Sequence, residues 1–94
     1  MKLIAKKLIK EGKVTDAIKL YEELVQFSRK EEGCLAYDLF QDEKDSSILA
    51  VIEEWESKEA LEKHTNSQHF TKLVPMLGEL TEEKLGMNIY NKII

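Results

Sequence analysis

The most informative segment of the chain is Glu53–Phe70, which reads EEWESKEALEKHTNSQHF. An apolar run leads into this segment and predicts a strand over Ile48–Glu56. Ser57 predicts the start of a helix because its side-chain oxygen can accept a backbone N–H, and Glu59 suits the positive end of the helix dipole. Asn66 and Ser67 predict a break and the start of a second helical piece. Both histidines and the only tryptophan lie in this segment, so we expect any chemical centre to be built around it.

The rest of the chain predicts three more strands and one long helix. Apolar residues at spacings of three and four indicate a helix over Val14–Arg29, with capping chemistry at Thr15 and Asp16. Gly86 is expected to precede the last strand. The expected strands are Leu3–Ile9, Leu35–Phe40 and Met87–Ile94. The order β-α-β-β-α-β predicts an α+β fold, a ferredoxin-like sandwich with its helices on one face of an antiparallel sheet.

Length and charge limit what the protein can be. A chain of 94 residues is enough for one domain, which we expect to span residues 1–94. The net charge of −4 argues against a nucleic acid as partner, since phosphate binding needs a basic surface. We also expect no membrane-spanning segment and no secretory signal, because charged residues interrupt every apolar run early. The single cysteine, Cys34, indicates a reducing cytoplasm and is expected to be a small buried residue.

The third expected strand carries apolar residues on both of its faces. One face holds Ile48, Ala50 and Ile52, and the other holds Leu49, Val51 and Trp55. A single layer of helices can cover only one of these faces. We therefore expect the other face to pack against a second copy of the chain in a homodimer.

Three motifs carry a family resemblance. They are Glu31–Leu39 (EEGCLAYDL), Glu54–His64 (EWESKEALEKH) and Ser67–Phe70 (SQHF), with Gly12 and Lys13 fitting before the long helix. In these motifs the chain resembles the antibiotic biosynthesis monooxygenase domain, a family of small dimeric α+β barrels. The resemblance covers nearly the whole chain in length and element order. It implies a ferredoxin-like subunit that forms a dimeric α+β barrel.

The resemblance also implies a choice of activities. The family includes cofactor-independent oxygenases of quinols or polyphenolic anthrones, haem-degrading enzymes, and an isomerase of a phosphorylated signal-breakdown product. The haem-degrading enzymes use an asparagine, a tryptophan and a histidine where this sequence has Lys7, His64 and Val74, so haem degradation is not implied. The pattern of His64 and His69-Phe70 is closer to the oxygenases and the isomerase.

His64 is the candidate catalytic residue. An imidazole with an ordinary pKa of about 6.5 could take a proton from a phenolic or enolic substrate, and only the resulting anion gives an electron readily to oxygen. The alternative is a residue at a helix C-terminus that interacts with the helix dipole. His69 lies beyond the helix break, which is not the i, i+4 spacing of two metal ligands on one helix. We expect no metal and no cofactor, and expect His69 to line the pocket or to tie the break to a strand.

Four other residues are candidate substrate contacts. Trp55 and Phe70 could form an aromatic wall for a flat substrate, although a tryptophan at the end of a core strand is more typical of a core or an interface. Tyr37, like Tyr90, could donate a hydroxyl hydrogen bond or simply cap the sheet edge. Glu54, if it faced inward, could bond to a histidine and orient its ring.

Three functions remain open from the sequence. The first is a cofactor-independent monooxygenase that acts on a small aromatic substrate with molecular oxygen. The second is an isomerase of a small, phosphorylated hydroxyketone, for which Arg29 is the only arginine available. The third is a dimeric module that binds an apolar metabolite without catalysis. Activity without oxygen separates the second function from the first.

Overall fold

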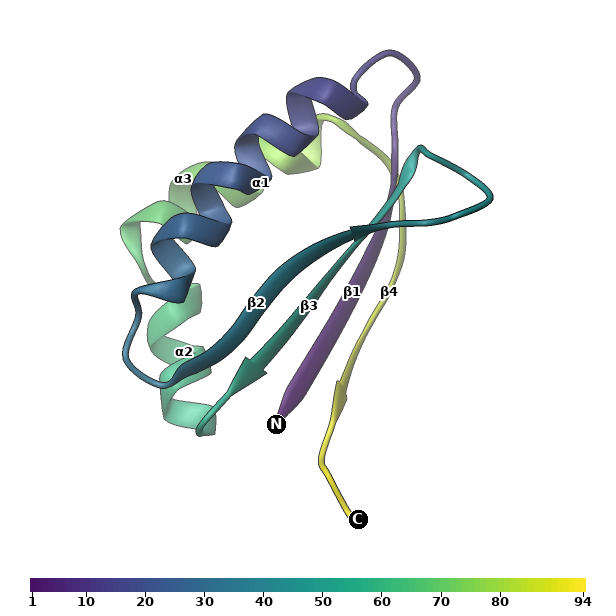
Figure 1. Cartoon of the computed structure of the whole chain (residues 1–94). Coiled ribbons are helices and arrows are strands. Elements are labelled where there is room, and N and C mark those ends of the chain that lie inside the picture. The colour runs from purple at the N-terminus through teal and green to yellow at the C-terminus, as the bar shows by residue number, and fades with distance from the viewer.

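The computed structural model describes the whole chain, residues 1–94, as one layer of helices on a four-stranded sheet (Figure 1). Its elements are β1 (Lys2–Ile9), α1 (Val14–Arg29), β2 (Cys34–Gln41), β3 (Ile48–Trp55), α2 (Lys58–Thr65), α3 (Gln68–Glu79) and β4 (Thr81–Tyr90). The strand order is β2-β3-β1-β4, and every neighbouring pair is antiparallel. The predicted ferredoxin-like fold is confirmed. None of the helices has the length and apolar character needed to cross a bilayer.

The long helix α1 has the predicted bounds, and its buried residues form one stripe. These residues are Ala17, Tyr21, Leu24, Val25 and Ser28. The predicted caps are wrong, because the residue before the helix is Lys13 and no side chain caps it. Asp16 lies in the first turn, where its charge still favours the helix dipole.

The predicted break between the second and third helices is confirmed, and serines begin both helices. The Ser57 hydroxyl accepts the N–H of Ala60 at 3.1 Å, and the Ser67 hydroxyl accepts the N–H of Phe70 at 3.3 Å. A hydroxyl at this position satisfies a backbone donor that has no partner inside the helix. The break lets the chain turn just after His64, so that His69 starts a new helix close to it.

The last strand differs from the prediction. It begins at Thr81 and contains Gly86, which was expected to precede it. Lys6 pairs with Gly86 but Lys7 pairs with Lys84, so Leu85 is an extra residue in a bulge. Gly86 has a φ of +119°, a conformation that side chains disfavour, which explains why glycine stands inside the strand.

The two faces of the sheet have different surroundings. On β3 the residues Leu49, Val51, Glu53 and Trp55 are buried under the helices, and the residues between them are half-buried. The register places further apolar side chains on the face away from the helices. This open face carries Ile4, Leu8, Phe40, Ile48, Ala50 and Ile52. The sequence prediction of two apolar faces on β3 is confirmed.

Candidate functional site

A cavity of about 680 Å³ lies between the helices and the strands β1, β3 and β4. Most of its wall is apolar, with Leu24, Leu77 and Phe70 among the contributors. Polar groups at one end of the sheet come from Tyr37, Glu53 and His64, and Glu53 is the only acidic residue in the wall. A mostly apolar cavity with a few convergent polar groups is typical of small-molecule sites.

His64 occupies the last turn of α2 and is only 1% exposed. Three aromatic rings surround it. Its ring centroid lies 4.6 Å from that of Trp55, 5.1 Å from that of Phe70 and 5.4 Å from that of Tyr37. This packing fixes the orientation of the imidazole. An exposed histidine at a helix end would have no such fixed orientation. The interpretation of His64 as a simple helix C-terminal residue does not describe this environment.

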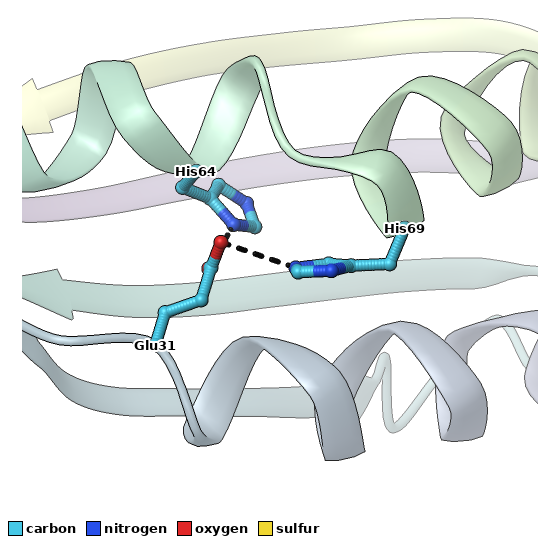
Figure 2. Close-up of side chains that lie close together, drawn as sticks. All are labelled: Glu31, His64 and His69. Atoms are coloured by element: carbon cyan, nitrogen blue, oxygen red, sulfur yellow. Dashed lines mark hydrogen bonds and ion pairs between the residues drawn. The ribbon is translucent and has the colours of Figure 1, made fainter.

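Glu31 joins the two histidines (Figure 2). It lies in the loop between α1 and β2, and its Oε2 is 2.6 Å from Nδ1 of His64. Its other oxygen, Oε1, lies 3.2 Å from Nε2 of His69, close enough for an ion pair but without hydrogen-bond geometry. His69 in turn stacks on Phe27, with 5.6 Å between the ring centroids. One carboxylate therefore positions the ring of His64 and contacts that of His69.

The contact with Glu31 decides which nitrogen of His64 is free. A carboxylate can only accept hydrogen bonds, so a neutral His64 carries its proton on Nδ1 and donates it to Glu31. Nε2 then holds a lone pair, and it has no hydrogen-bond partner. Burial lowers the pKa of His64, and Glu31 partly offsets this by favouring the protonated ring. A neutral imidazole with a free lone pair is the form that a general base requires.

Glu53 is the carboxylate of β3 that faces inward. Trp55 Nε1 donates a hydrogen bond of 2.8 Å to Oε1 of Glu53, which is 5% exposed and lies 3.9 Å from Nε2 of His64. Burial raises the pKa of Glu53 to about 7, while the bond from Trp55 lowers it and the charge of Glu31 raises it. A carboxyl group with this pKa exchanges protons at neutral pH.

The hypothesis that Glu54 pairs with a histidine is wrong. Side chains alternate along β3, so Glu54 lies on the open face opposite Lys2 and Ala36. It makes no ion pair with either histidine and is absent from the cavity wall. Glu53 takes the inward position because it shares the face of Val51 and Trp55.

Comparison with known proteins identifies the family of this chain. A model of the family described as Antibiotic biosynthesis monooxygenase matches residues 1–75. The chain belongs to this family. A crystal structure of an antibiotic biosynthesis monooxygenase is 38% identical, covers 99% of this chain and 98% of its own, and has a TM-score of 0.93.

Two curated relatives match this chain at a lower sequence identity than that crystal structure does. "Putative monooxygenase YcnE" of Bacillus subtilis is 31% identical over 79 residues, which cover 84% of this chain and 83% of that protein. "Uncharacterized protein sll1783" of Synechocystis is 27% identical over 82 residues, which cover 87% of this chain. The match covers 56% of the Synechocystis protein, so the chain spans little more than half of that relative.

The other residues predicted for the site of this monooxygenase-family domain differ in whether they line the cavity. Tyr37 and Phe70 line the cavity beside His64. Trp55 is fully buried behind His64 and positions Glu53, so its visible role is structural. Tyr90 is 53% exposed and lies on the open face, as its pairing with Lys2 shows. Cys34 is half-buried, and burial raises the pKa of its thiol.

Glu31, His64 and His69 could also hold a metal ion. Each offers one ligand atom, and the three atoms lie within 4.8 Å of one another. Two imidazoles and a carboxylate are a donor set that zinc and iron use in proteins. The contact of 2.6 Å between Nδ1 and Oε2 is, however, a hydrogen-bond distance, and an ion would have to replace the shared proton. As they stand, a hydrogen bond joins Glu31 to His64, and a close contact without hydrogen-bond geometry joins Glu31 to His69.

Sequence reasoning missed Glu31 and favoured Glu54 over Glu53 as the partner of a histidine. The contact of Glu31 with His64 spans 33 residues of sequence, so no local pattern indicates it. The one signal for Glu31 was its place in the motif Glu31–Leu39, which carried the family resemblance. The signal for Glu53 was its alternation with Trp55, which shares the buried face.

Proposed function

We propose that this domain is a cofactor-independent monooxygenase that oxidises a small quinol-like or polyphenolic substrate with molecular oxygen. The observation that carries the proposal is the buried pair of Glu31 and His64 at the wall of a mostly apolar cavity. The pair supplies a base with a fixed tautomer, and the cavity supplies room for aromatic rings. Family membership agrees with this class of reaction.

His64 begins the reaction by taking a proton from the substrate at Nε2. The imidazolium that forms keeps its Nδ1–H bond to Glu31, whose negative charge stabilises it. The substrate anion then passes an electron to oxygen, and the two recombine as a substrate peroxide. The imidazolium of His64 returns its proton to this peroxide. The carbon that carries the peroxide then loses its remaining hydrogen as a proton while the O–O bond breaks, so one oxygen atom stays as a carbonyl and the other leaves as water. The substrate supplies all the electrons, so atoms and charges balance without a cofactor.

Two further residues of the cavity wall assist this sequence. Burial and the charge of Glu53 raise the pKa of Tyr37, so its hydroxyl stays protonated and can donate a hydrogen bond to a substrate oxygen. Glu53 is protonated in part at neutral pH, and it can give a proton to the oxygen that leaves as water. Both residues lie on adjacent strands and are paired directly in register.

The functional unit of the proposal is a homodimer. The open face holds a group of apolar residues that no element of the chain covers, and a second copy of the same sheet is the simplest cover. Ile52→Asp should separate the subunits because it places a charge in the centre of this face, whereas Lys2→Asp at its edge should not. Sedimentation velocity measures both, and a wild-type protein that sediments as a monomer would overturn this part of the proposal.

Oxygen uptake with a panel of hydroquinones, naphthols and anthrones tests the activity. Loss of the base in His64→Gln should lower kcat by about 10²- to 10⁴-fold, the usual contribution of general base catalysis. Uptake that is the same in wild type and His64→Gln would refute the mechanism. Turnover of a hydroxyketone under strict anaerobiosis would instead indicate the isomerase. Arg29 offers that alternative no support, since it pairs with Asp38 at 2.8 Å and is absent from the cavity wall.

A further inference from the structure

Two lysines stand side by side in the cavity wall without any acidic partner. Lys7 of β1 and Lys84 of β4 are paired directly across the two strands, and both line the cavity. Neither forms an ion pair or a side-chain hydrogen bond with any residue of the chain. Like charges placed directly opposite in a sheet destabilise it. The fold therefore keeps an unfavourable arrangement at this point of the cavity.

The bulge in β4 creates this arrangement. From Lys2 to Lys6 the register of β1 and β4 is regular, and its continuation would place Leu85 opposite Lys7. The extra residue shifts the strand by one position, so Lys84 takes that place. Lys7 alternates with Ala5 and Ile9 and so lies on the face that the helices cover. Without the bulge a leucine would face the cavity where the second ammonium group now does.

The environment of the pair suits a negative charge. Lys7 is half-buried, and burial together with the charge of Lys84 lowers its pKa. The only carboxylate in the cavity wall, Glu53, lies opposite Leu3, four residues along β1 from Lys7. At a rise of about 3.3 Å per residue this separation is roughly 13 Å along the sheet, too far for an ion pair. A bound anion would supply the missing partner and remove the repulsion.

We propose that Lys7 and Lys84 form an anion subsite, which binds a carboxylate or phosphate group at the far end of a substrate from its phenolic oxygen. This inference rests on the proposed function, because it takes His64 to be the end of the cavity where the phenolic oxygen binds. The flexible side chains of the lysines cover part of the distance between the two ends. The rest of the distance between His64 and the two lysines can be spanned by a phenol of two or three fused rings that carries an acidic group.

Binding of three naphthalene probes tests the subsite without requiring turnover. The probes are 2-naphthol, which is neutral, 6-hydroxy-2-naphthoate, which carries a carboxylate, and 6-hydroxy-2-naphthyl phosphate, which carries a phosphate; all three keep a free phenolic hydroxyl. Isothermal titration should show that at least one anionic probe binds about 10- to 100-fold more tightly than 2-naphthol, the usual gain from a charged hydrogen bond. The anion that binds more tightly identifies the group that the subsite accepts.

Matched variants then assign the effect to the two lysines. Lys7→Met and Lys84→Met should each remove most of the preference for the anionic probes and leave the affinity for 2-naphthol unchanged. Lys19→Met, which removes the same charge from an exposed position on α1 outside the cavity wall, should keep the preference. Lys7→Arg should retain part of the preference for the anionic probes. That result would show that the preference depends on the positive charge at this position, and not on a change in the fold.

Equal affinities of the wild type for all three probes would overturn the subsite, as would a preference that survives in both methionine variants. These binding results are independent of whether the protein proves to be an oxygenase. Oxygen uptake with a neutral quinol that persists in Lys7→Met would leave the oxygenase intact while the subsite fails. Tight binding of the anionic probes with no oxygen uptake would do the reverse.

Discussion

The contact between Glu31 and His64 allows a quantitative prediction for Glu31→Gln. The substitution keeps the size of the side chain and an oxygen that can accept from Nδ1, but it removes the negative charge. A hydrogen bond to a charged partner contributes about 1.5 to 3 kcal/mol, against about 1 kcal/mol for a neutral one. The imidazolium form of His64 should therefore lose about 0.5 to 2 kcal/mol of stabilisation, which corresponds to roughly a 2- to 30-fold change.

The direction of the effect follows from the charge. Glu31 favours the protonated ring, so its loss should move the pKa of His64 further below its ordinary value. If the imidazolium forms in the rate-limiting step, kcat should fall by about 2- to 30-fold. Proton NMR can follow the titration directly, because the chain has only two histidines and His69→Gln identifies the remaining signal. Oxygen uptake measures the rate.

Glu32→Gln is the matched control for this prediction. Glu32 is the exposed neighbour of Glu31, makes no ion pair, and loses the same charge when it is replaced. It should leave both the titration of His64 and the rate unchanged. An unaltered titration of His64 in Glu31→Gln, or an equal change in both variants, would refute the role of the pair.

Three further predictions concern stability and metals. The pKa of Glu53 is raised to about 7 from an ordinary 4.5, so its contribution to stability is complete below pH 4.5 and is lost as the pH rises to 7. Urea unfolding should show that the free energy of unfolding of the wild type falls by on the order of 3 kcal/mol between pH 4.5 and 7, relative to that of Glu53→Gln. Parallel plots of the free energy of unfolding against pH for the two proteins would contradict this prediction. Gly33→Ala should destabilise by about 1 to 3 kcal/mol, since Gly33 has a φ of +84° and a new Cβ would lie 2.6 Å from that of Ala60. Gly12→Ala, with a φ of +77° and open space around it, should cost less in the same unfolding assay, and an equal cost would show that the contact is unimportant. Treatment with EDTA should leave oxygen uptake unchanged, whereas loss of activity that zinc or iron restores would assign the cluster of two histidines and Glu31 to a metal.

Local patterns predicted most of the fold. The bounds of α1, the serines that begin α2 and α3, and the break between these helices are encoded within a few neighbouring residues. The start of β4 was missed because the bulge at Leu85 depends on pairing with β1, which lies more than 70 residues earlier in the chain. Gly86 was interpreted as a strand boundary for the same reason.

The candidate site was predicted in part. His64, Tyr37 and Phe70 come together at the cavity, as the aromatic and imidazole pattern indicated. Glu31 could not be placed because its role comes from a contact between a loop and a distant helix. The choice between Glu53 and Glu54 was within reach, since a strand that buries Val51 and Trp55 must also bury the residue between them on the same face.

The proposed reaction requires His64 to ionise the substrate before oxygen reacts. An anthrone or naphthol probe bound under anaerobic conditions tests this step, because the anion of the probe absorbs at longer wavelength than its neutral form. We expect the spectrum of the anion to appear when the probe binds to wild type, to be absent in His64→Gln, and to decay when oxygen is admitted. A bound probe that stays neutral in the wild type and is nevertheless oxidised when oxygen is admitted would show that His64 does not act as the base.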